Sequence, residues 1–140
     1  MKRDYPDRPI VGVGAVVVED GRALVVKRGV EPLKGQWSIP GGAVELGETL
    51  RAAAAREAHE ETGLLVEPGE VLEVFDSIYR DPSGRTQYHY VLVDFLCRCV
   101  GGELRAASDA SEVRWVTLDE LPALNMTETA QRLVRKALSK

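Results

Sequence analysis

Three glutamates in the first half of the chain have the residue type and the spacing of a metal site. Glu57, Glu60 and Glu61 stand at positions i, i+3 and i+4, which are neighbouring positions on one side of a helix. Like charges this close raise one another's pKa values unless a cation lies between them. Carboxylate oxygens favour hard cations, and no matching set of His and Cys points to zinc, so the pattern predicts Mg²⁺ or Mn²⁺.

The same residues also fit a solvated acidic helix end. Clusters of charge on helices usually face water, so the three glutamates on their own favour this plainer interpretation. Arg56, four residues before Glu60, would then be the partner in an ordinary surface ion pair, which contributes little to stability.

The position of the glutamates along the helix bears on this choice. At about 100° per residue, Ala53, Ala54, Glu57 and Glu61 fall on the same face as Leu50. A stripe that packs Leu50 and the alanines against a sheet would carry the glutamates toward the same partner, where an unpaired carboxylate is strongly disfavoured. We therefore expect a cation to meet them.

The element that carries these glutamates is predicted to be a helix over residues 49–62. This segment is rich in alanine and other good helix formers, and Gly63 stands where a left-handed cap would end it. Ahead of the helix, Gly41 and Gly42 have no side chains, so their backbone can approach a metal ion or a phosphate closely. The same Pro-Gly-Gly also fits an ordinary turn.

The remaining segments predict an α/β fold, a sandwich of helices around a mixed sheet. The first two strands form a hairpin, Pro32 and Gly35 place a loop at residues 31–36, and Thr117 with Glu120 has the spacing of a capping box for a short helical turn. An amphipathic helix around residues 130–138 ends the chain. The expected strands cover residues 10–18, 23–26, 37–39, 71–79, 88–100 and 113–116.

The composition is that of a single globular domain, residues 1–140. The formal net charge of −4 argues against a nucleic-acid polymer as partner and favours a small ligand. No stretch approaches transmembrane length and no apolar run follows the charged residues 1–9, so neither a membrane partner nor a secretory signal is expected. Two cysteines, Cys97 and Cys99, do not make a disulfide framework, which predicts buried thiols and a cytoplasmic location.

Residues 42–64 resemble a complete Nudix box. After Gly42 come five residues, Glu48, seven residues, and then Arg56-Glu57-Ala58-His59-Glu60-Glu61-Thr62-Gly63-Leu64. Seven fixed residue types, each at roughly 6% abundance, coincide by chance on the order of once in 10⁹ starting points. The preceding segment, residues 37–42, is also similar to the family. The resemblance outweighs the solvated-helix interpretation and implies a Nudix-type α/β/α sandwich around a mixed β-sheet.

The resemblance also implies roles for the residues of the box. Glu60 and Glu61 would be metal ligands, and Glu57 would be a further ligand or the general base that activates water. The carbonyl oxygen of Gly41 would complete the coordination of Mg²⁺ or Mn²⁺, and Arg56 would orient a carboxylate.

Other residues would support this site. Gly42 lets the backbone approach closely, and Glu48 would bind the metal through water or hold the loop. Members of the family often add an acidic residue from a later loop as ligand or base, for which Asp109 and Glu112 are both candidates. Glu45, in the loop between Gly42 and the helix, is a further candidate for the same role.

The activity implied by the resemblance is hydrolysis of a nucleotide diphosphate linkage. Residues 88–97 are similar to the ADP-ribose pyrophosphatase-like subgroup, which favours ADP-ribose as substrate, with AMP and ribose 5-phosphate as products. The diagnostic proline of many such enzymes would lie between Pro68 and Pro82, so the chain departs from that pattern. The alternative is a MutT-like enzyme that releases pyrophosphate from an ordinary or oxidised nucleotide. A third is a nucleotide-sensing module without turnover. A homodimer is expected from the resemblance alone.

Overall fold

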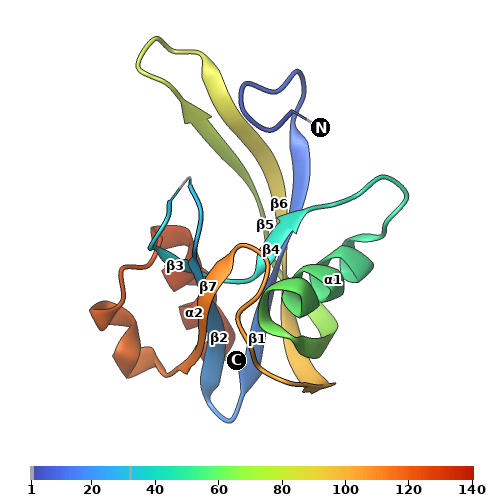
Figure 1. Cartoon of the computed structure of the whole chain (residues 1–140), viewed down its shortest axis with the longest axis vertical. Helices are drawn as coiled ribbons and strands as arrows, with labels where there is room; N and C mark the ends of the chain where they lie inside the picture. The colour runs from blue at the N-terminus through green and yellow to red at the C-terminus, as the bar shows by residue number, and fades with distance from the viewer. Residues whose placement is uncertain (1, 32) are drawn as a thin grey trace.

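A computed structural model describes residues 2–31 and 33–140. Met1, and Pro32 in the predicted loop, lie outside the described residues. Figure 1 shows a mixed sheet with α1 on one side and α2 on the other. The strands are β1 (Ile10–Glu19), β2 (Arg22–Arg28), β3 (Trp37–Ser38), β4 (Gly41–Ala43), β5 (Leu64–Arg80), β6 (Thr86–Gly102) and β7 (Ala110–Val116). The helices are α1 (Leu50–Thr62), a 3₁₀ helix η1 (Leu118–Ala123) and α2 (Glu128–Leu138).

Strand β1 lies at the centre of the sheet. The strand order is β3-β2-β1-β6-β5, with β4 paired to β1 and β7 paired to β2. β1 runs parallel to β6 and antiparallel to β2 and β4. Residues 12–17 of β1 are all buried, as expected for a strand with both faces covered. The predicted α/β architecture is confirmed.

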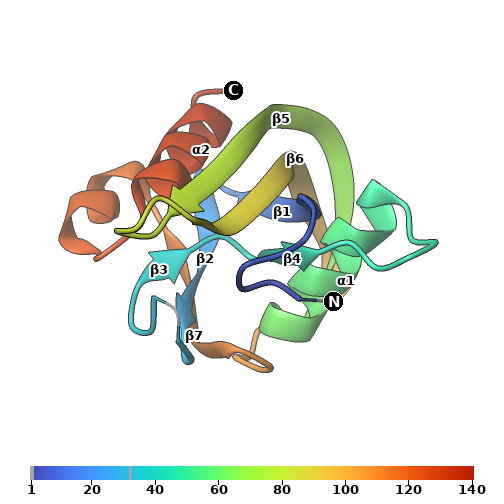
Figure 2. The ribbon, with the colours of Figure 1, turned by 90° about the horizontal axis from the view of Figure 1, so that it is seen from above.

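The two faces of the sheet carry separate hydrophobic clusters. On one face, α1 packs against alternate residues of β1 and β6, among them Val13, Ala15 and Phe95. On the other, α2 covers Val16 with Leu133 and Ala137. Side chains alternate between the faces along a strand, so the central strands hold a helix on each side, an arrangement that Figure 2 shows from above.

Helix α1 ends as its sequence predicts and begins one residue later, at Leu50. The hydroxyl of Thr49 accepts a hydrogen bond from the backbone N–H of Ala52 at 3.1 Å, which is a side-chain N-cap. Gly63 ends the helix with a φ of 76°. Leu50 was expected on the packed stripe, but it is 37% exposed. The sheet contacts α1 through small residues, and Ala53, Ala54 and Ala58 form the buried stripe instead.

The largest differences from the prediction are the start of β5 and the presence of β4. β5 begins at Leu64 instead of residue 71, because its first residues pair with the far end of β6, Leu64 opposite Gly102 and Val66 opposite Cys99. Gly41 and Gly42, for which the sequence suggested a turn or a close approach of backbone to a ligand, form strand β4 together with Ala43 and pair with residues 12–14 of β1. Both segments owe their conformation to partners far away in the sequence.

β7 begins three residues earlier than the predicted strand 113–116, and the segment after it follows the prediction. Thr117 and Glu120 form the predicted capping box at the start of η1. Thr127 caps α2 by accepting from the backbone N–H of Ala130, and α2 buries the predicted apolar residues Leu133 and Val134. Within the described part of the chain, no helix has both the length and the apolar character needed to cross a membrane.

Candidate active site

Strand β4 holds the start of the box against the last two turns of α1. The backbone N–H of Gly41 donates to Oε1 of Glu61 at 3.1 Å. A Cβ atom on Gly42 would lie 2.5 Å from Oε1 of Glu57, so a side chain at this position would displace the Glu57 carboxylate from where it now lies. The pairing of β4 with β1 therefore fixes the distance between the glycines and the glutamates.

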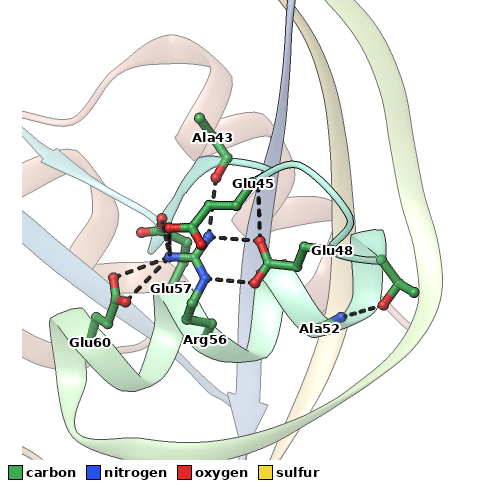
Figure 3. A network of polar contacts seen from close by, with 8 residues as sticks. Ala43, Glu45, Glu48, Ala52, Arg56, Glu57 and Glu60 are labelled. Carbon is green, nitrogen blue, oxygen red and sulfur yellow. Dashed lines mark hydrogen bonds and ion pairs between the residues drawn. The ribbon is translucent and has the colours of Figure 1, made fainter. Parts of the chain in front are cut away.

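Arg56 lies at the centre of the acidic cluster, as Figure 3 shows. Its Nε and Nη2 donate to the two carboxylate oxygens of Glu48 at 2.7 and 2.9 Å, a bidentate pair. Its Nη1 donates to Glu57 at 3.0 Å and to Glu60 at 3.3 Å. Nη2 also reaches the carbonyl oxygen of Ala43 at 3.2 Å. The guanidinium thus joins the loop before α1 to two of the three box glutamates.

Glu48 anchors that loop from the other side. Its Oε1 also accepts a hydrogen bond from the backbone N–H of Glu45 at 3.1 Å. The hydrogen bonds from Arg56, followed by this backbone bond, lower the pKa of Glu48 to about 2. The carboxylate is therefore charged at neutral pH and holds both the loop and the arginine.

Glu61 is the most deeply buried of the three glutamates. It is 9% exposed, and burial raises its pKa to about 8, although the hydrogen bond from Gly41 acts in the opposite direction. The charges of Glu57 and Asp109 raise it further. Burial also raises the pKa of Glu57, against the influence of Arg56. A cation placed beside these carboxylates would offset the cost of burying their charge.

The donor atoms fit a hard divalent cation in kind. Glu57, Glu60 and Glu61 offer only oxygen. The N–H and carbonyl of one strand residue point to the same side in an antiparallel pair, so the carbonyl of Gly41 lies on the side of Glu61. Across residues 2–31 and 33–140, however, no three His, Cys, Asp or Glu side chains form a ready-made metal cluster. Glu57 and Glu60 bind Arg56 here and would have to turn toward a cation.

A model of the Nudix domain matches residues 8–137, nearly the whole chain. The chain belongs to the Nudix hydrolase family. Members of this family generally use divalent metal ions, which agrees with the oxygen donors of the box.

Two named relatives support this membership. The chain is 40% identical over 116 residues to an ADP-ribose pyrophosphatase of Methanocaldococcus jannaschii, covering 83% of this chain and 66% of that protein. It is 42% identical over 116 residues to a putative 8-oxo-dGTP diphosphatase 2 of Mycobacterium tuberculosis, covering 80% of this chain and 75% of that protein.

The structural match extends over almost all of both chains. A MutT Nudix hydrolase from Burkholderia pseudomallei superposes with a TM-score of 0.80 at 32% identity, covering 93% of this chain and 98% of that one. The Nudix-type fold expected from the box is therefore confirmed.

The three additional acidic candidates occupy different places in this Nudix domain. Asp109, in the loop before β7, acts electrostatically on Glu61. Glu45 lies 3.9 Å from Nη1 of Arg56. Glu112 instead forms an ion pair with Arg114 at 3.2 Å on the exposed side of β7. The structure thus brings Asp109 and Glu45 to the site and leaves Glu112 engaged with Arg114.

A hollow of about 270 Å³ opens beside the box of the Nudix domain. It is lined by Glu57, by residues 43–46 of the loop, and by Arg3 from the N-terminal segment. The sequence did not indicate Arg3, because residues 2–8 carry charges of both signs without a motif. A second hollow of about 410 Å³, between α2 and strands β1, β5 and β6, contains none of the box glutamates.

Proposed function

We propose that this Nudix domain hydrolyses the diphosphate linkage of a nucleotide compound with Mg²⁺ or Mn²⁺, and that ADP-ribose is the favoured substrate. The observation that carries the proposal is the carboxylate of Glu61, buried against Gly41 beside the charged cluster of Glu57, Glu60 and Arg56. Burying acidic groups together is costly. A cation that binds there, and the anionic substrate that follows it, account for an arrangement that stability alone would disfavour.

In the proposed site, Glu60, Glu61 and the carbonyl of Gly41 hold the cation, with Glu57 as a further ligand or as the base. When bound, the ion supplies positive charge to the diphosphate oxygens and lowers the pKa of a water molecule. Arg56 and Glu48 hold the loop and the carboxylates in position, the role of supporting residues around metal ligands.

The proposed reaction is a hydrolysis of the bond between phosphorus and the bridging oxygen. The oxygen of a water molecule attacks one phosphorus, and the bond from that phosphorus to the bridging oxygen breaks. A carboxylate takes the proton of the water. We assign this step to Glu57, which burial makes a stronger base, with Asp109 and Glu45 as the other candidates. The bridging oxygen leaves with the second phosphate.

ADP-ribose is favoured because the relative from Methanocaldococcus jannaschii, 40% identical, is named an ADP-ribose pyrophosphatase. The products would be AMP and ribose 5-phosphate. A second candidate is a nucleoside triphosphate, ordinary or oxidised, cleaved to release pyrophosphate. The relative from Mycobacterium tuberculosis, named a putative 8-oxo-dGTP diphosphatase 2 and 42% identical, favours it.

A substrate panel tests the proposal. Purified protein with Mg²⁺ or Mn²⁺ is incubated with ADP-ribose, with ordinary dNTPs and with 8-oxo-dGTP, and the products are separated by chromatography. AMP from ADP-ribose supports the first candidate, and pyrophosphate from a dNTP supports the second. Binding without turnover on every compound would support a nucleotide-sensing module and contradict the proposed hydrolysis. The expected cytoplasmic location, homodimer and lack of nucleic-acid binding stay predictions.

A further inference from the structure

The N-terminal segment, residues 2–9, is attached to the tip of the β5–β6 hairpin. The hydroxyl of Tyr5 donates to Oδ2 of Asp81 at 2.6 Å, and the backbone N–H of Tyr5 donates to the carbonyl of Gln87 at 2.8 Å. The guanidinium of Arg85 lies 4.2 Å from the centre of the Tyr5 ring. Figure 1 shows the segment folded back beside this hairpin. Tyr5 is thus held by its ring, its hydroxyl and its backbone.

Asp81 is well suited to hold the tyrosine. Its Oδ1 accepts hydrogen bonds from the backbone N–H groups of Ser83 at 3.0 Å and Arg85 at 2.9 Å, so the carboxylate is fixed by its own turn. The hydrogen bonds from Tyr5, Ser83 and Arg85 lower the pKa of Asp81 to about 2. The acceptor therefore stays charged throughout the neutral range.

Arg3 stands two residues before Tyr5 and lines the hollow beside the box. The same hollow is lined by Glu57 and Glu45. Arg3 is the one cationic residue that lines this hollow among the residues described. Arg56 is close by, but its guanidinium is already bound to Glu48, Glu57 and Glu60.

We propose that Arg3 binds a phosphate group of the substrate, and that Tyr5 and Asp81 position it there. This inference rests on the proposed hydrolysis. A diphosphate brings negative charge to a site already rich in carboxylates, and an arginine at the wall of the hollow pairs with phosphate oxygens through charge-assisted hydrogen bonds. We assign Arg3 to binding, because it is not among the residues proposed to hold the metal or to move the proton.

The plainer interpretation is that Arg3 is an ordinary surface charge. Arg8 lies in the same segment and is also exposed, but it does not line the hollow. It is therefore a matched control: Arg8→Gln removes the same charge from the chain as Arg3→Gln. Arg3→Lys keeps the charge and loses the forked geometry, and Tyr5→Phe keeps the ring and loses the bond to Asp81.

The experiment compares these four variants with the unaltered full chain on the substrate that the panel identifies. Arg3→Gln is expected to raise KM about five- to tenfold with kcat within twofold. Arg3→Lys recovers part of the loss, Arg8→Gln leaves KM unchanged, and Tyr5→Phe raises KM about two- to threefold. In the double variant of Arg3→Gln with Tyr5→Phe, the effect of Tyr5→Phe disappears, since it acts through Arg3.

A binding measurement separates this inference from the proposed hydrolysis. Calorimetry measures the binding of α,β-methylene-ADP in the presence of Mg²⁺. This diphosphate has a methylene group in place of the bridging oxygen, so it is not hydrolysed there and the measurement needs no turnover. Arg3→Gln is expected to weaken this binding by the same factor as KM. If the unaltered protein turns over its substrate while Arg3→Gln changes neither KM nor the dissociation constant, Arg3 has no such role. If the unaltered protein neither binds the probe nor turns over any substrate, both proposals are wrong.

Discussion

Asp94 is a buried aspartate whose carboxylate is not fully hydrogen-bonded. It is 3% exposed on β6, and its Oδ2 has no hydrogen-bond partner among the residues that the structure describes. Its carboxylate occupies the space that a side chain at residue 14 would need, so Gly14 is required beside it. Burial raises the pKa of Asp94 to about 6, helped by the charge of Glu73 and opposed by Arg132.

Asp94→Asn is expected to stabilise the protein at high pH only. The folded protein binds the proton more tightly than the unfolded chain, so stability falls as the pH rises from the unfolded pKa toward the folded pKa of about 6. Above that range the charged carboxylate costs about 2–3 kcal/mol, which asparagine removes. Urea unfolding at pH 8 should show this gain, with a difference below about 1 kcal/mol at pH 4.

The control for Asp94 is Asp76→Asn, which changes an exposed aspartate on β5 and is expected to leave the free energy of unfolding the same at both pH values. An equal effect of Asp94→Asn at pH 4 and pH 8 would show that its cause is packing, not charge.

Glu61→Gln is expected to abolish turnover without unfolding the protein. The amide oxygen can accept the hydrogen bond that Gly41 donates, and no charge then needs to be buried. Loss of a metal ligand should lower kcat/KM by more than about 100-fold and weaken Mg²⁺ binding measured by calorimetry. A variant that binds Mg²⁺ and turns over as before would remove Glu61 from the metal site.

Helix α1 ends at Gly63, which has a left-handed backbone and lies against the loop after β6. Gly63 and Gly47 both have positive φ, 76° and 85°. A methyl group on Gly63 would collide with the carbonyl oxygen of Glu103, whereas nothing lies within 4 Å of one on Gly47. The two glycines therefore separate the cost of left-handed backbone from the cost of a collision.

Gly47→Ala is expected to lower the free energy of unfolding by about 1 kcal/mol, the strain of a left-handed alanine. Gly63→Ala should lower it by about 3 kcal/mol, because the loop after β6 must also move away from α1. Chemical unfolding of the two variants measures the difference. Equal losses would mean that the loop yields freely to the new methyl group.

The elements also show how far the sequence predicts this structure. The C-terminal cap of α1 at Gly63 follows from a local signal and was predicted, whereas Thr49, which was expected inside the helix, is its N-cap. The strand at Gly41–Ala43 was not predicted, because its conformation depends on β1. Leu50 was placed on the buried face by periodicity alone, which does not show where the sheet ends.

The candidate site is also predictable from the sequence only in part. The spacing of the box glutamates and Arg56 is visible in the sequence and gave the family. The convergence of Arg56 on Glu48, eight residues earlier, requires the loop to fold back. The approach of Arg3 requires a contact between Tyr5 and Asp81, 76 residues apart, for which the sequence holds no local signal.

A cation that binds only the folded protein should stabilise the fold as a whole. At ten times its dissociation constant, Mg²⁺ is expected to add about 1.4 kcal/mol and raise the Tm by about 3–5 °C. Thermal unfolding with Mg²⁺ and with EDTA measures this, and Glu61→Gln is the control, since its Tm should not respond to Mg²⁺. An equal response of both proteins would place the stabilising ion elsewhere.

The central position of β1 has a consequence for how the chain folds as it is synthesised. Residues 10–17 leave the ribosome 80 residues before their parallel partners, residues 90–97. At ~5–20 residues per second, this strand waits ~4–16 s for β6. During that time one edge of an apolar strand is open to pairing with other chains. A nascent or truncated chain that ends before residue 90 is therefore the form most exposed to aggregation.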